Sequence, residues 1–577
     1  MDPLNLSIPR QHNFIDPTVE RDLVRLQDWL SNLPPMDVVE TVRLVLGALE
    51  ALNEQQLESD EQRFQFLEAY RAVGFDAQCL YVRLISRVGP WFRESRLQYP
   101  ELGVIASAVD DLLGCGLAQQ ADGLSLEDLA GLCTVAELTD RYGLRAADKA
   151  SLLQQIGEIE GDEQAILHAL LAADDARVIA PAQTGIVAIL QLLFFGNRRQ
   201  GLTDFVLSDL GVARYYPYTL DRNQRLFPDR AALEAYLDFA AREDQWYALL
   251  EQDDVEGIRE LASAMSSSVA THRPALQRRW DRLYNRVARQ LERLEESPLA
   301  LALYALSNRH PARERSARLL EKSGAYAQAE ALCEAIAAEP WCEDELDAAQ
   351  RIVARVRRKL HGTRVPRCRD AFDQLDLSLP RAHSRVERQA AQSLHGDWQQ
   401  VHYVENGLMN ALFGLAFWEQ IFAPIPGAFN NPYQSAPADM YERDFRANRA
   451  EQLSLRLAEL SALPLDVELP ARWRRYRGFQ CRWVNWRTIP EDLVVAATAV
   501  IPGEHLLAIW QRILFDPREN RRGFPDLLAL GSDVGDYQMI EVKGPGDTLQ
   551  NSQKRWLRFF QQHAIPAAVA HVRWADD

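Results

Sequence analysis

The feature that most constrains the fold of this chain is a change of pattern near residue 380. From about residue 17 to 370, apolar residues recur every three or four positions, as in VVETVRLVLGALEAL and RRWDRLYNRVARQLERL. That spacing is the period of an amphipathic helix. Proline and glycine fall between such segments. At 577 residues the chain exceeds what one hydrophobic core usually supports. The sequence therefore predicts several domains, of which the first are all-helical.

A different pattern follows residue 380. The helix-like run VENGLMNALFGLAFWEQIF precedes a long segment rich in Pro, Trp and Arg. Three short runs with β-strand character come next, namely PDLLAL, YQMIEVK and AAVAHVRW. The helical stretch LQNSQKRWLRFFQQH lies between the last two runs. The order strand, strand, helix, strand predicts a mixed α/β domain at the C-terminal end.

The segment TVAELTDRYGLRAADKASLLQQI has a more specific pattern within the helical part. It predicts two short helices joined by a turn at Gly143, and it resembles the SAP module, a helical hairpin that contacts DNA backbones. Arg141, Arg145 and Lys149 would then face phosphates. The alternative is an ordinary helical hairpin, which needs the same glycine and the same leucines.

The segment ARLLEKSGAYAQAEALCEAIAAEP resembles a tetratricopeptide helix pair. Gly324 falls at the expected turn, and Ala327, Ala331 and Ala335 are small enough to permit close approach of two helices. No clean repeat of 34 residues runs through several copies. We therefore expect a helical repeat region that acts as a scaffold or holds a duplex arm.

The cysteine content and the length of the apolar runs indicate in which cellular compartment the protein functions and whether it spans a membrane. The seven cysteines are scattered and include no C-x-x-C pair, so neither a zinc finger nor a disulfide framework is indicated. A reducing, cytoplasmic compartment is expected. The N-terminus lacks a basic region followed by an apolar run, and the most apolar stretch, Ile186 to Phe195, is about half the length that spans a bilayer. We therefore expect a soluble protein without a membrane partner.

The formal net charge of −18 opposes binding of a polyanion when the chain is taken as a whole. Screening limits the reach of each charge to roughly 10 Å at moderate salt, so local clusters matter more than the sum. Residues 351–370 contain eight basic side chains against one acid, and residues 273–293 contain seven arginines against two acids. These clusters would line a nucleic-acid groove or, alternatively, be solvated on exposed helices.

The residues that carry chemistry lie in the β-type runs. If PDLLAL and YQMIEVK pair as a hairpin, Asp526 and Glu541 meet at one end of the sheet. Mg²⁺ and Mn²⁺ prefer carboxylate, carbonyl and water oxygens. Side chains alternate along a strand, so Glu541 and Lys543 share a face, and the Val542 carbonyl is a further candidate ligand. We expect a divalent cation there, Mg²⁺ or Mn²⁺.

This arrangement suits phosphodiester hydrolysis. That reaction needs an activated water and neutralisation of the charge that develops on the phosphoryl and leaving oxygens, and a divalent cation supplies both. Lys543 would orient the attacking water or stabilise the developing charge. No Ser-His-Asp grouping offers an alternative nucleophile. The sequence therefore predicts Asp526, Glu541 and Lys543 as catalytic residues.

The strings GFPDLLAL, YQMIEVKGPGD and QKRWL closely resemble the VRR-NUC branch of the PD-(D/E)xK nucleases. The resemblance implies that Gln553 lies on the helix after the catalytic strand and belongs to the site. It also implies an upstream glutamate that ligates the metal, and Glu405 matches that position. The alternative for Glu405 is an exposed acid at a helix start, favoured there by the helix dipole.

Leu80 to Tyr99 and Thr203 to Tyr215 resemble segments of the Fanconi-associated nuclease family, so that the resemblance covers nearly the whole chain. It implies cleavage of branched or flapped DNA near 5′ flaps, 5′-to-3′ exonuclease activity and a role in interstrand crosslink repair, in the cytoplasm or on the nucleoid of a bacterium. We expect four domains, namely an N-terminal helical domain (1–115), a SAP-like DNA-binding region (116–225), a TPR-like helical repeat region (226–380) and a VRR-NUC nuclease domain (381–577).

This chain departs from the family pattern in two ways, the first of which separates it from the animal members. The Cys/His spacing of a ubiquitin-binding zinc finger is missing, so no ubiquitin-binding module is expected. Thr548 and Ser552 are neutral where some relatives carry basic residues, so Lys554, Arg555 and the basic clusters are the candidates for binding a 5′ phosphate. The alternatives for the whole chain are a VRR-NUC four-way junction resolvase and a non-catalytic adaptor that binds branched DNA.

Overall fold

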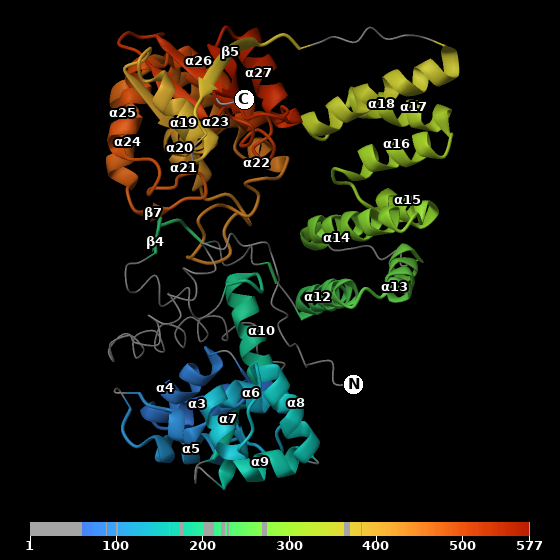
Figure 1. Ribbon diagram of the computed structural model, residues 1–577, viewed down its shortest axis with the longest axis vertical. Helices are drawn as coiled ribbons and strands as arrows, with labels where there is room; N and C mark the ends of the chain where they lie inside the picture. The colour runs from blue at the N-terminus through green and yellow to red at the C-terminus, as the bar shows by residue number, and fades with distance from the viewer. Residues whose placement is uncertain are drawn as a thin grey trace. The chain divides into compact units, whose positions relative to one another are not determined.

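The computed structural model describes residues 61–575, except 88, 100–101, 161, 173–176, 201–212, 221–225, 228–229, 268–273, 363–369 and 382–383. The chain forms two compact units, Met1–Ala213 and Arg214–Asp577. The described residues are mostly helical, and a sheet-containing domain follows at the C-terminal end (Figure 1). This order confirms the predicted fold class, whereas the SAP and TPR assignments and the four domain boundaries remain predictions.

The first unit combines short helices with a small antiparallel sheet of order β1-β3-β2. Its helices are α3 (Glu61–Ala72), α4 (Phe75–Ile85), α5 (Ile105–Gly114), α6 (Leu126–Leu132), α7 (Val135–Tyr142), α8 (Lys149–Ile159), α9 (Glu163–Leu171) and α10 (Thr184–Phe195). Its strands are β1 (Phe92–Arg93), β2 (Ala118–Gln120) and β3 (Val178–Pro181). Gly143, in the left-handed conformation with φ of 64°, ends α7, so the predicted turn between two short helices is present.

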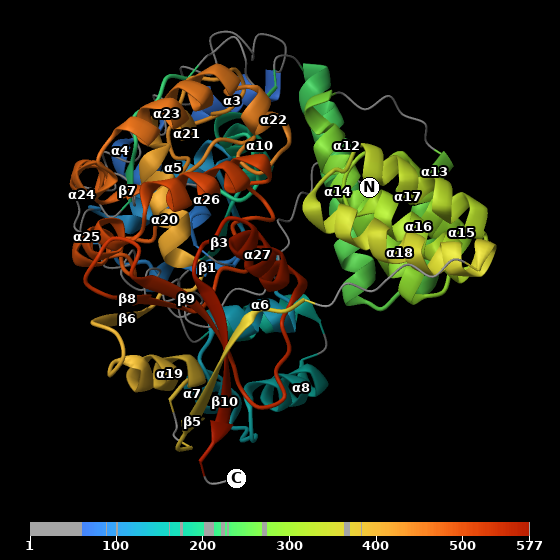
Figure 2. The same cartoon turned by 90° about the horizontal axis from the view of Figure 1, so that it is seen from above.

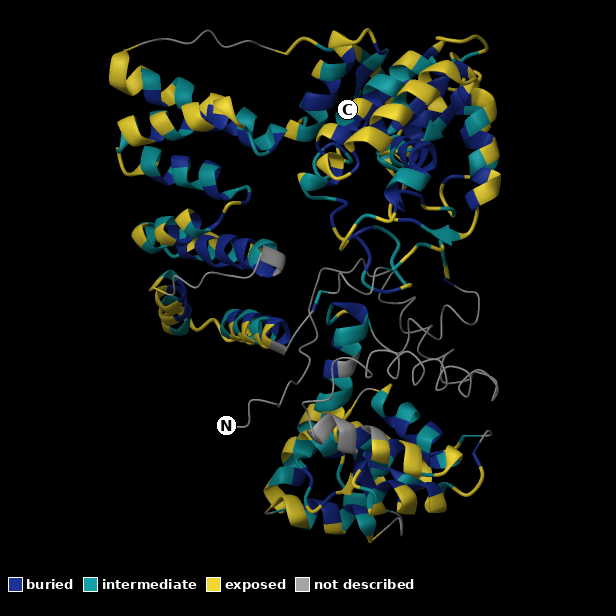
Figure 3. Cartoon of the chain, turned by 180° about the vertical axis from the view of Figure 1, so that it is seen from behind, coloured by how far each residue is buried: buried dark blue, intermediate teal, exposed yellow. Residues whose placement is uncertain are grey.

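After the short strand β4 (Arg214–Tyr215), the second unit continues with helices that pack mainly against their neighbours in sequence. They are α12 (Arg230–Glu251), α13 (Val255–Ser267), α14 (Pro274–Arg293), α15 (Ser297–Leu306), α16 (Ala312–Lys322), α17 (Tyr326–Ala338) and α18 (Glu343–His361). Each has buried and exposed faces (Figure 3). Gly324, with φ of 81°, joins α16 to α17 as expected.

The alanines that were expected at the helix contact were assigned to the wrong face of α17. Ala327, Ala331 and Ala335 are exposed, whereas Ala329, Cys333 and Ile336 are buried against α16 and α18. Alanine is common both at close helix contacts and on solvated helix surfaces, so the alanine pattern by itself does not identify the packed face.

The C-terminal domain is built on a five-stranded sheet of order β5-β10-β9-β8-β6. β10 is parallel to both β5 and β9, whereas β8 is antiparallel to both β6 and β9. The three predicted strands are present as β8 (Leu527–Leu530), β9 (Tyr537–Lys543) and β10 (Ala567–Trp574), with α27 (Asn551–Gln562) between the last two. Sequence analysis missed the edge strands β5 (Asp373–Leu379) and β6 (Gln400–Tyr403) because they are polar or short.

Helices cover both faces of this sheet (Figure 2). α19 (Val386–Leu394) packs on one face, where Ala390 and Leu394 join Leu527, Ile540 and Val542 in one core cluster. α27 and the helices between β6 and β8 cover the other face, where the second core cluster includes Leu528, Met539, Trp556 and Phe560. The ends of the central strands therefore lie between two helical layers.

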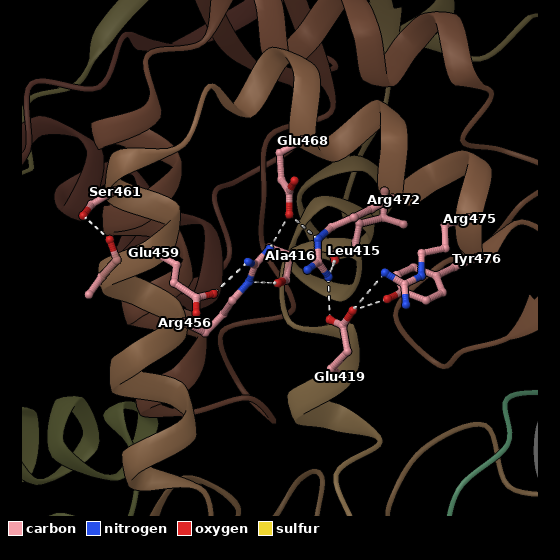
Figure 4. Close-up of polar contacts among 11 residues, drawn as sticks. Leu415, Ala416, Glu419, Arg456, Glu459, Ser461, Glu468, Arg472, Arg475 and Tyr476 are labelled. Carbon is pink, nitrogen blue, oxygen red and sulfur yellow. Dashed lines mark hydrogen bonds and ion pairs between the residues drawn. The ribbon is translucent and has the colours of Figure 1, made fainter.

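The helices inserted between β6 and β8 are held by a network of partly buried charges. They are α20 (Gly407–Ala416), α21 (Trp418–Ile421), α22 (Asp444–Ala447), α23 (Ala450–Ala462), α24 (Leu465–Tyr476), α25 (Glu491–Val500) and α26 (Gly503–Phe515). Arg472 bridges Glu468 and Glu419, at 2.6 Å each, and Arg456 contacts Glu468 at 2.9 Å (Figure 4). Such charges are costly to bury unless they are paired, so this network is structural.

Among the described residues, no single helix is long and apolar enough to cross a bilayer. The consecutive helices α25 and α26 reach that length and composition only when taken together, with a bend of 111° between them.

Gly523 controls how closely the loop before β8 approaches α27. Its φ is +86°, and a Cβ atom there would lie 2.7 Å from the carbonyl carbon of Ser552 and 2.9 Å from the backbone nitrogen of Gln553. Gly535 has a similar φ of +90°, but a Cβ there would meet nothing within 4 Å. We predict that Gly535→Ala lowers the free energy of unfolding by about 1 kcal/mol, from backbone strain alone. Gly523→Ala should lower it by about 3 kcal/mol, because a steric clash is added.

Urea unfolding of the full chain, followed by tryptophan fluorescence, measures both losses. Equal losses for the two variants would contradict the close approach of the Gly523 loop to α27.

Candidate active site

The hairpin of β8 and β9 brings the predicted acids together. Leu527 pairs with Ile540 in the antiparallel register, so Asp526, which immediately precedes β8, lies across from Glu541. The backbone N–H of Val542 donates to Oδ2 of Asp526 at 2.9 Å. Asp526 is therefore fixed by the backbone of the strand that carries the second acid, as the predicted hairpin requires.

Glu541 is held by two side chains and is 1% exposed. Its Oε1 lies 2.7 Å from Nζ of Lys543 and accepts a hydrogen bond from Nε2 of Gln553 at 2.6 Å. Gln553 is itself fixed, because its Oε1 accepts from the backbone N–H of Gln550 at 2.8 Å in the capping box of α27. The structure thus brings together Glu541, Lys543 and Gln553 as predicted.

Within the described part of the chain, the second oxygen of Glu541 has no hydrogen-bond partner. Among the described residues, nothing donates to its Oε2, although that atom is buried. An unsatisfied buried acceptor is costly, and it gains a partner when a cation or a proton binds. This orphaned oxygen, next to Asp526, is the observation that best supports a divalent cation at the site.

Glu405 reaches the same end of the sheet through a turn before α20. The backbone N–H groups of Val404 and Glu405 both donate to the carbonyl oxygen of Asp526, at 2.9 and 3.0 Å. Glu405 has φ of 40°, a left-handed conformation that non-glycine residues rarely adopt. Its carboxylate is exposed and accepts a hydrogen bond from the hydroxyl of Tyr403 at 2.8 Å. The turn therefore positions Glu405 beside Asp526.

Both central acids hold protons more strongly than usual. Burial raises the pKa of Asp526 to about 6, with a further increase from the negative charge of Glu387. Burial also raises the pKa of Glu541 to about 7, and the adjacent charge of Asp526 adds to the effect. Two buried carboxylates side by side resist joint ionisation. A divalent cation would offset the repulsion between the two negative charges, so that both carboxylates could be ionised together.

Glu387 is a charged neighbour of the site that sequence analysis missed. It lies in the first turn of α19, and its charge acts on both Asp526 and Tyr403. The segment RVERQAAQSL has an amphipathic helical pattern, so a helix with an acid at its start was predictable. Its position over the ends of β8 and β9 was not, because that depends on tertiary packing.

The donor set fits a hard divalent cation. Asp526, Glu541 and Glu405 offer carboxylate oxygens, and Mg²⁺ and Mn²⁺ take such ligands together with carbonyl and water oxygens. Within the described ranges, no group of three or more His, Cys, Asp or Glu side chains is arranged so that it could already hold a metal ion. The cation ligands, including the Val542 carbonyl, therefore remain predictions, as does the choice between Mg²⁺ and Mn²⁺.

The basic residues predicted to contact DNA in the first unit have internal contacts. Nζ of Lys149 donates to the carbonyls of Ala130 and Cys133, at 2.6 and 2.8 Å. Nη1 of Arg141 donates to the carbonyl of Ala169 at 2.9 Å. These contacts stabilise the ends of helices, whereas Arg145 is exposed. Phosphate binding by Arg141, Arg145 and Lys149 remains a prediction.

Ion pairs neutralise part of the predicted basic cluster on α18. Arg355 pairs with Glu321 at 2.6 Å, and Arg357 pairs with Glu330 at 2.7 Å. Arg555, a candidate for the 5′ phosphate, is buried and pairs with Asp344 at 2.8 Å. Arg273, Arg364, Arg367 and Arg369, and most of the segment Thr203 to Tyr215, lie outside the described residues.

A second cationic group, from distant parts of the second unit, was not predicted as a set. Partial desolvation and the charge of Arg309 lower the pKa of Arg282 to about 10, although the Arg282 side chain still reaches solvent. Desolvation and Arg309 also lower the pKa of Arg518. Glu442 pairs with Arg309, and Glu519 lies 3.8 Å from Nε of Arg518. Arginines that lower one another's pKa are not fully neutralised, so this group, called here the arginine cluster (Arg282, Arg309 and Arg518), would attract an anion.

Comparisons with known proteins show which family this chain resembles. Residues 463–574 match the family model of the VRR-NUC domain, and residues 39–119 match the model "FAN1, HTH domain". The chain is 35% identical over 530 residues to the Fanconi-associated nuclease 1 homolog of Pseudomonas aeruginosa, with coverage of 90% of this chain and 92% of the relative. It is 25% identical to the homolog of Arabidopsis thaliana, of which it spans 64%.

A solved structure is similar over almost the whole chain. It is described as paFAN1 bound to DNA with a 5′ flap of two nucleotides and a gap. Its TM-score is 0.83 at 33% identity, and the match covers 94% of this chain and 98% of that one. A second structure, with a 5′ flap of one nucleotide, matches with a TM-score of 0.79 at 32% identity.

The raised pKa values predict how a cation changes stability with pH. Without a cation, the two acids are protonated more readily in the folded than in the unfolded chain. They therefore contribute stability below about pH 4, and this contribution is lost as pH rises through about 6 for Asp526 and about 7 for Glu541. A cation binds the ionised acids, so Mg²⁺ should raise Tm more at about pH 8 than at about pH 5.

Thermal unfolding with and without Mg²⁺ at both pH values checks this expectation. Glu541→Gln removes one of the two charges and should reduce the Mg²⁺-induced shift at high pH. A shift that is independent of pH, or unchanged in this variant, would argue against cation binding by these acids.

Proposed function

Because the chain belongs to the Fanconi-associated nuclease family, we propose that it is a structure-selective, cation-dependent DNA nuclease that hydrolyses phosphodiesters near 5′ flaps. We further propose 5′-to-3′ exonuclease activity and a role in the repair of DNA interstrand crosslinks. The observation that carries the proposal is the arrangement of Asp526, Glu541, Lys543 and Gln553 at one end of the sheet. The solved relatives bound to 5′ flap DNA support this choice of substrate.

The chemistry assigns a role to each of these side chains. A divalent cation, when bound, acidifies water and stabilises the charge that develops on the phosphoryl oxygens. Asp526 and Glu541 would hold the cation, with Glu405 and the Val542 carbonyl as further ligands. Gln553 keeps Glu541 in place through a hydrogen bond of 2.6 Å. The ammonium of Lys543, 2.7 Å from Glu541, would orient the attacking water or stabilise the phosphate oxygens.

We propose that the arginine cluster binds the phosphate at the 5′ end of the flap. A terminal phosphate carries more charge than an internal phosphodiester, and guanidinium groups bind phosphates in a bidentate manner. Arg518 follows α26 and precedes Asp526 on the same connection, which links the proposed phosphate site to the candidate active site through a short stretch of chain. This proposal replaces Arg555, which is engaged with Asp344.

Cleavage of a labelled 5′ flap with Mg²⁺ or Mn²⁺ tests the assigned site. Glu541→Ala should lower the rate by at least about a hundredfold, because it removes a cation ligand and leaves Lys543 without its partner. Asp533→Asn, an exposed acid in the turn of the same hairpin, should cleave like the wild type. Full activity of Glu541→Ala would reject the site.

The same assay compares the candidate functions. Efficient cleavage of four-way junctions, without preference for flaps, would favour a junction resolvase. Binding of branched DNA without cation-dependent turnover would favour an adaptor.

A 5′-phosphorylated flap, compared with the same flap ending in a hydroxyl group, tests the arginine cluster. Arg518→Ala should lower the efficiency of cleavage of the phosphorylated flap by about tenfold or more, because it removes a charge-assisted hydrogen bond. The flap with a 5′ hydroxyl should be affected much less. Arg573→Ala, at an exposed position on β10, is the matched control. An equal loss on both flaps would exclude a role in recognising the terminal phosphate.

A further inference from the structure

The helix α27 carries Gln553 on one side and Arg555 on the other. Nε2 of Gln553 donates to Oε1 of Glu541 at 2.6 Å, so this side of α27 faces the candidate active site. Residues two positions apart on a helix point in nearly opposite directions. The guanidinium of Arg555 is only 7% exposed, so it must be covered by another part of the chain on the side of α27 away from Glu541.

Acids from the start of α18 cover Arg555. Nη1 of Arg555 donates to Oδ1 of Asp344 at 2.8 Å and lies 3.6 Å from Oδ2 of Asp347. Both acids lie in the first two turns of α18, which is the last of the helices α12–α18 (residues 230–361), called here the helical arm. Farther along, α18 packs through Ile352 on α16 and α17. α18 therefore extends from the core of the helical arm to α27 (Figure 1).

A second arginine strengthens this connection from α26. Nη2 of Arg512 donates to Oε2 of Glu343, the first residue of α18, at 2.5 Å. The guanidinium carbon of Arg512 lies 4.6 Å from the ring centres of both Trp556 and Phe559 on α27. Cations are attracted to aromatic faces at such distances. α18, α26 and α27 are thus fixed to one another around two arginines whose side chains are mostly buried.

The carboxylate of Asp344 is ionised throughout the physiological pH range. Its Oδ2 lies 3.6 Å from Nε2 of His310, and its Oδ1 accepts from Arg555. The contacts with His310 and Arg555 lower the pKa of Asp344, against the effect of burial. Hydrogen bonds between an arginine and an ionised carboxylate are short, strong and directional. The pair of Asp344 and Arg555 is therefore suited to fix the position of a helix.

The position of α27 matters because Gln553 holds Glu541 by a single hydrogen bond. Oε1 of Gln553 is already bound to the backbone N–H of Gln550 in the capping box of α27, so the amide moves with its helix. Glu541 belongs to the sheet, on β9. A shift of α27 by about 1 Å would stretch the bond of 2.6 Å beyond hydrogen-bond length. Misplacement of this size can slow an enzyme substantially.

We propose that the ion pair of Asp344 and Arg555 is a positioning pair, which sets the place of α27 and, through Gln553, the orientation of Glu541. The inference rests on the proposed function, because it assigns the pair a role in DNA cleavage. Asp344 and Arg555 act through Gln553 and not on the phosphodiester itself. The helical arm then supports the active site in addition to any contact that it makes with DNA.

Single-turnover cleavage of a 5′ flap at saturating Mn²⁺ tests the proposal. Asp344→Asn keeps the shape of the side chain and removes its charge. It should lower the maximal rate about tenfold and change the protein concentration that gives half of this rate by less than about twofold. Asp344→Glu restores the charge and should recover most of the rate. The double variant Asp344→Asn, Arg555→Gln should be no slower than the slower single variant, because both changes remove one interaction.

Asp444→Asn is the matched control. Asp444, on α22, forms another ion pair with the helical arm, through Arg278, and its side chain is 42% exposed, against 36% for Asp344. This pair does not involve α27, so the variant should cleave like the wild type. An equal fall for Asp444→Asn would show that any loosening of the helical arm slows cleavage. That result, or a wild-type rate for Asp344→Asn, would overturn the proposal.

Hydrogen exchange of the full chain without DNA, measured by mass spectrometry, separates positioning from general stability. Asp344→Asn should speed exchange about tenfold within α27 and leave β8 and β9 as protected as in the wild type. Faster exchange throughout the second unit would mean a general structural role and would contradict the proposal. If Asp344→Asn does not fold, Arg555→Lys, which loses the planar guanidinium and keeps the charge, provides the same comparison.

The exchange measurement also distinguishes this inference from the proposed function. If the wild-type protein does not cleave flaps in Mn²⁺, the proposed function fails. Local exchange of α27 in Asp344→Asn still decides whether the pair fixes that helix.

Discussion

The antiparallel pairing of β8 with β9 is the interaction on which the rest of this site depends. It places Asp526 across from Glu541 in a buried environment, where the backbone of Val542 holds one acid and Lys543 and Gln553 hold the other. Carboxylates in such surroundings resist ionisation. The surrounding structure therefore holds in place a pair of acids whose ionised forms a divalent cation would stabilise. This stabilisation is the physical basis of the proposed chemistry.

The contrast with ion pairs elsewhere in the second unit supports a functional role. Arg449 pairs with Asp439 at 2.7 Å, and Arg512 pairs with Glu343 at 2.5 Å. Each of these pairs neutralises its own two charges, and the pair of Arg512 and Glu343 joins α26 to α18. At the end of the sheet the carboxylates outnumber the one ammonium that contacts them, that of Lys543. In the arginine cluster the guanidinium groups outnumber the carboxylates that pair with them. A protein is expected to leave such imbalances where a ligand of opposite charge binds.

Local patterns made the central part of the site predictable from sequence. The hairpin follows from two short β-type runs around a turn, and pairing of these runs brings Asp526 and Glu541 to one end of the sheet. Glu387 and the arginine cluster were not predictable, because distant segments converge there only after helices have packed. The same limit explains the alanines of α17, which lie on its exposed face, and the internal contacts of Lys149 and Arg141.

The central claim is that Asp526 and Glu541 hold a divalent cation beside Lys543. A crystal structure of the full chain soaked with Mn²⁺, with anomalous scattering used to locate the ion, tests it most directly. We expect an anomalous peak about 2.1 Å from a carboxylate oxygen of each acid, with Oε2 of Glu541 among the ligands. A peak elsewhere, or none while Glu541 stays bound only to Lys543 and Gln553, would contradict it.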